Sequence, residues 1–196
     1  MSKAYLFIDG TNLYAAQYEL FGPLKYLYFP NFIEEINDKL KLKFDKVLFY
    51  ASYSPKPENP TKKELLYLKN EFLFYLSVKE TTNVTFFKGY RSKASGKEKE
   101  VDVKLSVDMV DLAYKNEYQS IYLFSGDADF LQALFAIKPL GKKISVISME
   151  NHILYRAPFF FHTYIIQINR KTKIKFKKVQ KYSFMNLKTA KLLKKM

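Results

Sequence analysis

The chain of 196 residues has no cysteine and only two histidines. Without cysteine it has neither disulfide bonds nor thiolate metal ligands, and two histidines leave little scope for a zinc site built on imidazole. A chain without disulfides fits a reducing compartment, so we expect a cytoplasmic protein.

Long apolar runs are missing as well. The N-terminal MSKAYLFIDG is too short for the apolar core of a signal peptide, and no stretch approaches the roughly 20 apolar residues of a membrane span. We therefore expect a soluble protein with no membrane partner. Neither a GxSxG elbow nor a Walker loop occurs, so nucleophilic-serine catalysis and P-loop hydrolysis lack support.

Acidic residues are absent from the end of the chain. From Arg170 to Lys195 every charged side chain is lysine or arginine, eleven in all, within a total net charge of +14. We interpret residues 1–168 as one domain, for which 48% hydrophobic content suffices, and residues 169–196 as a basic tail. Such a tail suits salt-sensitive contact with a phosphate backbone, and a merely solvated basic surface explains it equally well.

Apolar runs alternate with helical patterns, which is typical of an α/β fold with a mostly parallel sheet covered on both faces. Strands are predicted at residues 4–8, 46–51, 84–87, 119–124 and 143–147, with an edge strand at 164–168. Helices are predicted at residues 12–20, 31–42 and 128–137, with two more starting after Thr61 and near Asp102.

Two of these helices carry start signals. Asn31 is a plausible N-cap, and Thr61 with Glu64 forms a capping box. In the helix after Thr61, we expect the buried stripe to consist of Leu65, Leu68, Phe72 and Leu76.

Two strings combine an apolar strand pattern with an aspartate at its end. YLFIDGTN puts Asp9 after the first strand, and IYLFSGDADF puts Asp127 and Asp129 after the fourth. Taken singly, each aspartate is explained as a turn residue or helix N-cap. Because ligands bind at the carboxyl ends of strands in an open parallel sheet, the two strings together favour a site.

Asp102 gives an independent indication of where that site lies. A helix turns about 100° per residue, which puts Asp102 in the apolar stripe that contains Met109 and Ala113. A carboxylate on a buried face is costly unless it is paired or bound to metal, so Asp102 is predicted to belong to the site; capping its helix is the alternative. By the same reasoning Asp111 faces solvent and Asp108 lies at the border of the two faces.

Converging carboxylates need a cation, because two of them about 5 Å apart repel by about 3 kcal/mol at an effective dielectric constant near 20. Oxygen ligands without histidine or cysteine favour Mg²⁺ or Mn²⁺, and magnesium held by carboxylates and waters usually indicates phosphate chemistry. Asn12 and Ser125, close to the aspartates in sequence, suit either the site or helix capping. His152 and His162 lie far from the motifs and are interpreted as structural.

Three strings in this order resemble a known family: DGTN at Asp9 to Asn12, KEVD at Lys99 to Asp102 with Asp108 beyond it, and SGDADF at Ser125 to Phe130. The arrangement is similar to the NYN domain of the LabA/DUF88 type, within the PIN-like nuclease superfamily, over residues 4–147. The resemblance implies a Rossmann-like three-layer α/β/α sandwich and a divalent-metal nuclease that acts mainly on RNA.

The motif positions that the resemblance carries over as catalytic are Asp9, Asn12, Asp102, Asp127 and Asp129. The predicted ligands of Mg²⁺ or Mn²⁺ are the four aspartates of this set together with Asp108. The polar loop 91–99 leads directly into the helix of Asp102, so Lys97 and Lys99 are predicted to guide the nucleic-acid backbone, together with the tail residues Arg170, Lys171 and Lys173.

Other interpretations stay open at this point. A haloacid-dehalogenase phosphatase is disfavoured, because the position of its nucleophilic aspartate is Phe7 here. A silent or regulatory nucleic-acid-binding module and a small-molecule phosphohydrolase are the two alternatives to a ribonuclease. DNA in place of RNA, internal or terminal cutting, and a homodimer formed through the aromatic segment 158–164 are likewise open.

Overall fold

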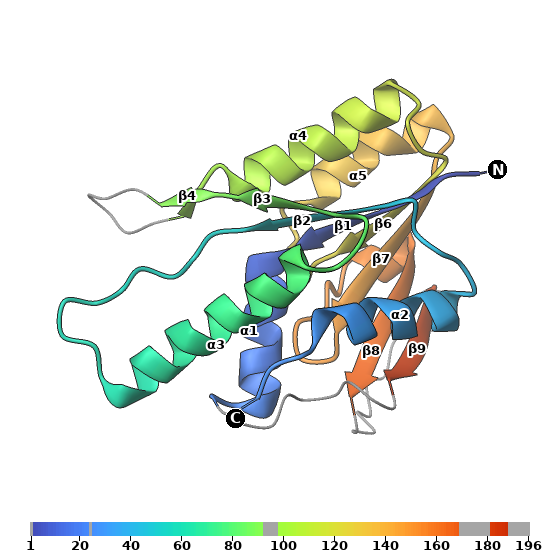
Figure 1. Cartoon of the computed structure of the whole chain (residues 1–196). Coiled ribbons are helices and arrows are strands. Elements are labelled where there is room, and N and C mark those ends of the chain that lie inside the picture. The colour runs from blue at the N-terminus through green and yellow to red at the C-terminus, as the bar shows by residue number, and fades with distance from the viewer. Residues whose placement is uncertain (1, 24, 92–97, 169–180, 188–196) are drawn as a thin grey trace.

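The computed structural model describes residues 2–23, 25–91, 98–168 and 181–187. Its centre is a seven-stranded sheet with strand order β3-β2-β1-β6-β7-β8-β9, in which all neighbouring strands run parallel (Figure 1). The strands are β1 (Ala4–Asp9), β2 (Lys46–Ala51), β3 (Val84–Lys88), β6 (Ser120–Phe124), β7 (Lys143–Met149), β8 (His162–Ile168) and β9 (Tyr182–Leu187). The predicted α/β fold with a mostly parallel sheet is therefore confirmed.

Helices cover both faces of this sheet, which gives three layers (Figure 1). One face carries α1 (Gly10–Phe21), α2 (Phe29–Leu40) and α3 (Lys62–Lys79), and the other carries α4 (Val101–Tyr114) and α5 (Leu131–Ile137). Two short 3-10 helices, η1 (Lys138–Leu140) and η2 (Ala157–Phe159), complete the helical elements of the described residues.

The first strand is buried along its whole length because both of its faces are covered. Leu6 and Ile8 pack in the core beneath α1, α2 and α3, whereas Tyr5 and Phe7 pack in the core beneath α4 and α5. At the end of the strand, a Cβ added to Gly10 would lie 2.1 Å from the Phe49 ring, so glycine is what lets α1 start so close to the sheet. This close approach fixes the position of Asp9.

The predicted helix starts are partly right. The capping box of Thr61 and Glu64 is confirmed, with hydrogen bonds in both directions. Asn31 as N-cap is wrong, because α2 begins at Phe29 and Tyr28 is the capping residue. Pro30 lies in the first turn, where its fixed φ suits a helix start and its missing N–H is not needed.

The predicted buried stripe of α3 is also wrong. Leu65, Phe72 and Leu76 are exposed, and the buried face includes Phe74 and Val78 instead. Apolar residues occur all round this helix, and its buried face also contains the polar Asn70 and Glu71. The sequence pattern therefore does not indicate which face is buried. The Glu71 carboxylate accepts hydrogen bonds from the backbone N–H and the hydroxyl of Ser54, which explains how a charged group is tolerated there.

Two further differences concern the ends of the predicted elements. The strand predicted at 164–168 is present as part of β8, but β9 lies beyond it, so a segment assigned to the basic tail forms the edge of the sheet. A separate antiparallel pair, β4 (Tyr90–Arg91) and β5 (Glu98–Lys99), flanks the undescribed residues 92–97. No helix in the described ranges combines the length and apolar character that crossing a bilayer requires.

Candidate active site

The candidate site lies where the strand order reverses between β1 and β6. Ile8 pairs with Phe124 across these two parallel strands, so Asp9 and Ser125 meet at the carboxyl edge of the sheet. Chain connections leave β1 and β6 in opposite directions across the sheet, and such a switch point is where open α/β sheets bind ligands.

A serine hydroxyl joins the two aspartate-bearing segments. Asp9 is only 4% exposed; its Oδ1 accepts the Asn12 backbone N–H at 2.9 Å, which caps α1, and its Oδ2 accepts the Ser125 hydroxyl at 2.9 Å. The same Ser125 oxygen accepts the backbone N–H of Asp127 at 3.0 Å. Asp9 therefore caps α1 with one carboxylate oxygen and contacts the segment after β6 with the other.

Asp127 and Asp129 lie on the solvent side of this arrangement. Both side chains are exposed, and the Asp129 backbone N–H donates to Asp127 Oδ1 at 2.9 Å, which holds a tight turn. The strand pattern was correct in bringing Asp9 and Asp127 to the same edge of the sheet. A buried carboxylate thus lies beside a solvent-facing one.

Asp102 does not occupy the buried helical face that we predicted. Its side chain is exposed in the first turn of α4, whose buried residues are Val101, Leu105, Met109 and Ala113. In the first turn the buried side is that of Val101, about 100° away from Asp102, whereas the helical wheel placed Asp102 beside Met109 and Ala113, which are buried two and three turns later. Asp102 instead lines an open, largely apolar surface hollow that includes Phe87, Val103 and Val107.

Asp108 lies six residues further along α4 and has two side-chain partners. Its Oδ2 accepts the Tyr50 hydroxyl at 2.8 Å and its Oδ1 pairs with Lys104 Nζ at 2.5 Å. The helical wheel put Asp108 at the border of the two faces, and its side chain is indeed only 20% exposed. The Lys104 ammonium neutralises the Asp108 carboxylate and the Tyr50 hydroxyl satisfies its other oxygen, so a structural role accounts for Asp108.

The fit of this edge to a divalent cation rests on its donor chemistry. In the described ranges, no three acidic or histidine side chains gather closely enough to hold an ion together, so the predicted cluster of five aspartates is not assembled. Magnesium, however, is commonly held by one or two carboxylates with waters and substrate phosphates completing its shell. Asp9 and Asp127, joined through Ser125, supply ligands of that type.

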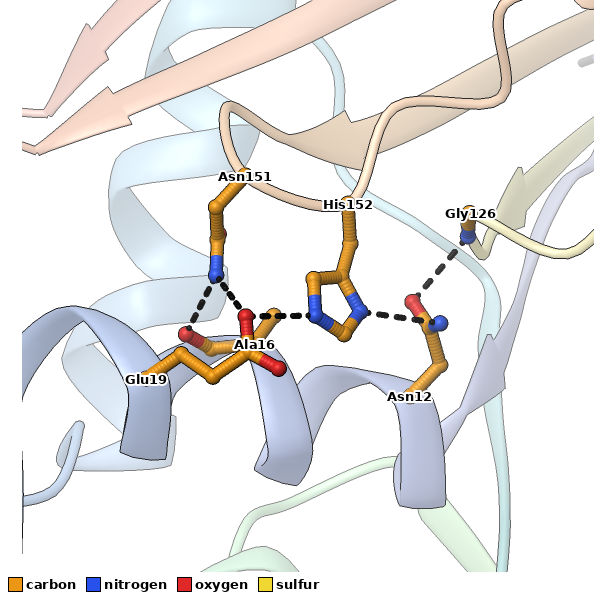
Figure 2. Close-up of polar contacts among 6 residues, drawn as sticks. All are labelled: Asn12, Ala16, Glu19, Gly126, Asn151 and His152. Atoms are coloured by element: carbon orange, nitrogen blue, oxygen red, sulfur yellow. Dashed lines mark hydrogen bonds and ion pairs between the residues drawn. The ribbon is translucent and has the colours of Figure 1, made fainter.

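Asn12 connects the same edge to a residue that the sequence did not assign to it. Asn12 Oδ1 accepts the Gly126 backbone N–H at 3.0 Å, and its Nδ2 lies 3.3 Å from His152 Nδ1 (Figure 2). His152 follows β7 by three residues, so strand-end position was the signal that could have found it. The predicted contacts with the nucleic-acid backbone lie outside the described part of the chain. They are Lys97, Arg170, Lys171, Lys173 and the side chain of Lys99.

Comparison with known proteins bears on the family and the fold of the chain. The family model of the NYN domain matches residues 3–165. A solved structure of a Vibrio parahaemolyticus protein of unknown function resembles the chain with a TM-score of 0.59 and 17% sequence identity, covering 98% of this chain and 96% of the other. At this identity the likeness shows the fold alone. No curated protein matches the sequence.

Replacing Ser125 by alanine should destabilise the protein. Ser125 is buried, and its hydroxyl both donates to Asp9 and accepts from Asp127, so the substitution should cost about 1–3 kcal/mol of unfolding free energy. Urea denaturation followed by circular dichroism measures this, with Asp129→Asn, an exposed side chain, as the control expected to change stability by less than about 0.5 kcal/mol. A Ser125→Ala protein as stable as wild type would show that the hydroxyl does not hold the two segments together.

Replacing Tyr50 by phenylalanine should make the free energy of unfolding fall less steeply as the pH rises above about 10. Burial, and next the hydrogen bond to Asp108, raise the pKa of Tyr50 above its ordinary value near 10. Above about pH 10 only the unfolded chain releases this proton, so stability falls by up to about 1.4 kcal/mol per pH unit for this group. Urea titrations between about pH 9 and pH 12 should give a shallower slope for Tyr50→Phe; identical slopes would contradict the assignment.

Proposed function

The chain belongs to the NYN domain family of PIN-like nuclease domains, and we propose that it is a divalent-metal-dependent ribonuclease that hydrolyses RNA phosphodiester bonds. The observation that carries the proposal is the buried Asp9 carboxylate, linked through Ser125 to the exposed Asp127 at the switch point of the sheet. A fixed carboxylate beside a solvent-facing one suits an ion that also binds a substrate phosphate.

Asp9 and Asp127 would hold Mg²⁺ or Mn²⁺, with Asp102 and Asp129 as further ligands reached directly or through water. When bound, such an ion polarises a phosphate oxygen and promotes deprotonation of an attacking water. The contribution of the protein is rigidity, because Asp9 is fixed by the helix cap and by Ser125 and needs little rearrangement.

Asn12 would orient the attacking water or a ligand carboxylate from the first turn of α1. Its Oδ1 is held by Gly126, which limits rotation of the amide. Next to Asp102, the apolar hollow lined by Phe87 and Val103 offers a surface for a nucleotide base. Lys99, Lys97 and the basic tail with Arg170, Lys171 and Lys173 would contact the RNA backbone, as their charge favours.

A nucleic-acid-binding module without catalysis is the second candidate. The observation in its favour is that, across the ranges the structure describes, no three acidic side chains gather around a common point, and Asp102 faces solvent. Such a module would bind RNA in a salt-dependent manner without turnover. Cytoplasmic location and a homodimer stay predictions under either function.

Incubation of the full chain with labelled single-stranded RNA and Mn²⁺ should give cleavage products. Cleavage should stop with EDTA, and Asp127→Asn should lower the rate by about 100-fold, because the variant removes a negatively charged ligand of the ion that activates the phosphate and the water. Asp111→Asn is the matched control, since Asp111 lies on α4 in an ion pair with Lys115 at 2.7 Å.

Three outcomes would contradict the proposal in different ways. Cleavage that survives chelation or the Asp127 substitution would exclude this mechanism. RNA binding that weakens as salt rises, without product under any divalent metal, would support the binding module instead. Phosphate release from nucleotides or sugar phosphates in preference to RNA would indicate a small-molecule phosphohydrolase.

A further inference from the structure

A chain of hydrogen bonds runs from the candidate site to the surface of α1. It links Gly126, Asn12, His152 and Glu19, with Asn151 joining at the far end (Figure 2). We infer that His152 is a positioning residue whose unprotonated Nδ1 fixes the orientation of the Asn12 amide at the active site. The catalytic consequence rests on the proposed ribonuclease function, whereas the orientation itself does not.

The direction of each bond follows from groups whose role is certain. The Gly126 backbone N–H can only donate, so the Asn12 atom 3.0 Å away is the amide oxygen. The other amide atom of Asn12 is therefore the NH₂ group, which donates. Its partner 3.3 Å away, His152 Nδ1, must accept and so carries no proton.

Glu19 selects the tautomer that this requires. The Glu19 carboxylate accepts from His152 Nε2 at 2.9 Å, so the imidazole proton lies on Nε2 and leaves Nδ1 free to accept. Asn151 Nδ2 donates to the same Glu19 oxygen at 3.0 Å and to the Ala16 carbonyl at 3.0 Å. The three bonds from Gly126 through Asn12 and His152 run in one direction toward Glu19, the arrangement in which hydrogen bonds strengthen one another.

The fold brings these groups together from three separate segments. Asn12, Ala16 and Glu19 are spaced four and three residues apart, so they share one face of α1 toward the loop after β7 (Figure 2). That loop turns back at His152, whose backbone N–H donates to Met149 at 3.0 Å. A Cβ at Gly126 would lie 2.3 Å from the His152 carbonyl oxygen, so glycine is required for this close approach.

If His152 only filled space between α1 and the loop after β7, the size of its side chain would matter and the position of its nitrogen atoms would not. The two roles can be separated because asparagine carries a polar atom at the position of imidazole Nδ1, whereas glutamine carries one at the position of Nε2. His152→Asn keeps an acceptor for Asn12 and gives up the contact with Glu19. His152→Gln keeps a donor for Glu19 and gives up the acceptor for Asn12.

The orientation is tested by the side-chain NH₂ signal of Asn12 in the full chain, recorded by NMR with ¹⁵N-asparagine and assigned by its loss in Asn12→Ala. The hydrogen-bonded proton should keep its downfield position in His152→Asn and move to that of free amides in His152→Gln. His162→Gln is the matched control, because His162 contacts Ser183 at 3.0 Å through its Nε2. An Asn12 signal that is the same in His152→Gln and wild type would overturn the inference.

The catalytic consequence is tested by RNA cleavage with Mn²⁺ in the same variants. His152→Gln should lower kcat by about 10- to 100-fold with KM nearly unchanged, and His152→Asn should recover most of that loss. Equal kcat values in both variants would overturn the positioning role, even if the NMR signals differ. If wild type cleaves no RNA, the proposed function fails and the Asn12 signal alone decides the inference.

Discussion

The hydrogen bond between the Ser125 hydroxyl and the Asp9 carboxylate is the interaction on which the candidate site depends. A carboxylate that is 4% exposed is tolerated only where its oxygens are satisfied, and here one oxygen caps α1 while the other binds Ser125. The bond exists because β1 and β6 are neighbours in register, so it ties helix α1 and the segment after β6 to one point of the sheet. Asp127 follows directly, because its N–H uses the same hydroxyl.

The chemistry of the edge follows from its unequal surroundings. Asp9 is buried and hydrogen-bonded through both oxygens, whereas Asp127, Asp129 and Asp102 face solvent, where a phosphate can reach them. Asp108 differs from Asp9 because the Lys104 ammonium already neutralises its charge, while Tyr50 donates to its other oxygen. Asn12 lies between these zones, held by Gly126 on the site side and by His152 on the other.

The sequence predicted the parts of the fold that depend on local pattern. Buried strands such as β1 and β2 have unmistakable apolar runs, and the strand-end aspartates followed from them. Predictions that required knowing which helical face meets the sheet failed for α3 and for Asp102, because periodicity does not reveal where a helix overlaps its neighbour. The contact of His152 with Asn12 joins residues that are 140 positions apart in the sequence, so no local sequence pattern predicts it.

The most direct test of the account is calorimetric titration of Mn²⁺ into wild type and Asp9→Asn. Asparagine still accepts the N-cap hydrogen bond through its oxygen and turns its NH₂ group toward the Ser125 oxygen, which can accept, so the fold should persist while the negative charge is lost. The account predicts that wild type binds Mn²⁺ and that Asp9→Asn weakens the affinity by at least about tenfold, with Asp111→Asn unchanged. Equal Mn²⁺ affinity in wild type and Asp9→Asn would contradict a metal site at the end of β1.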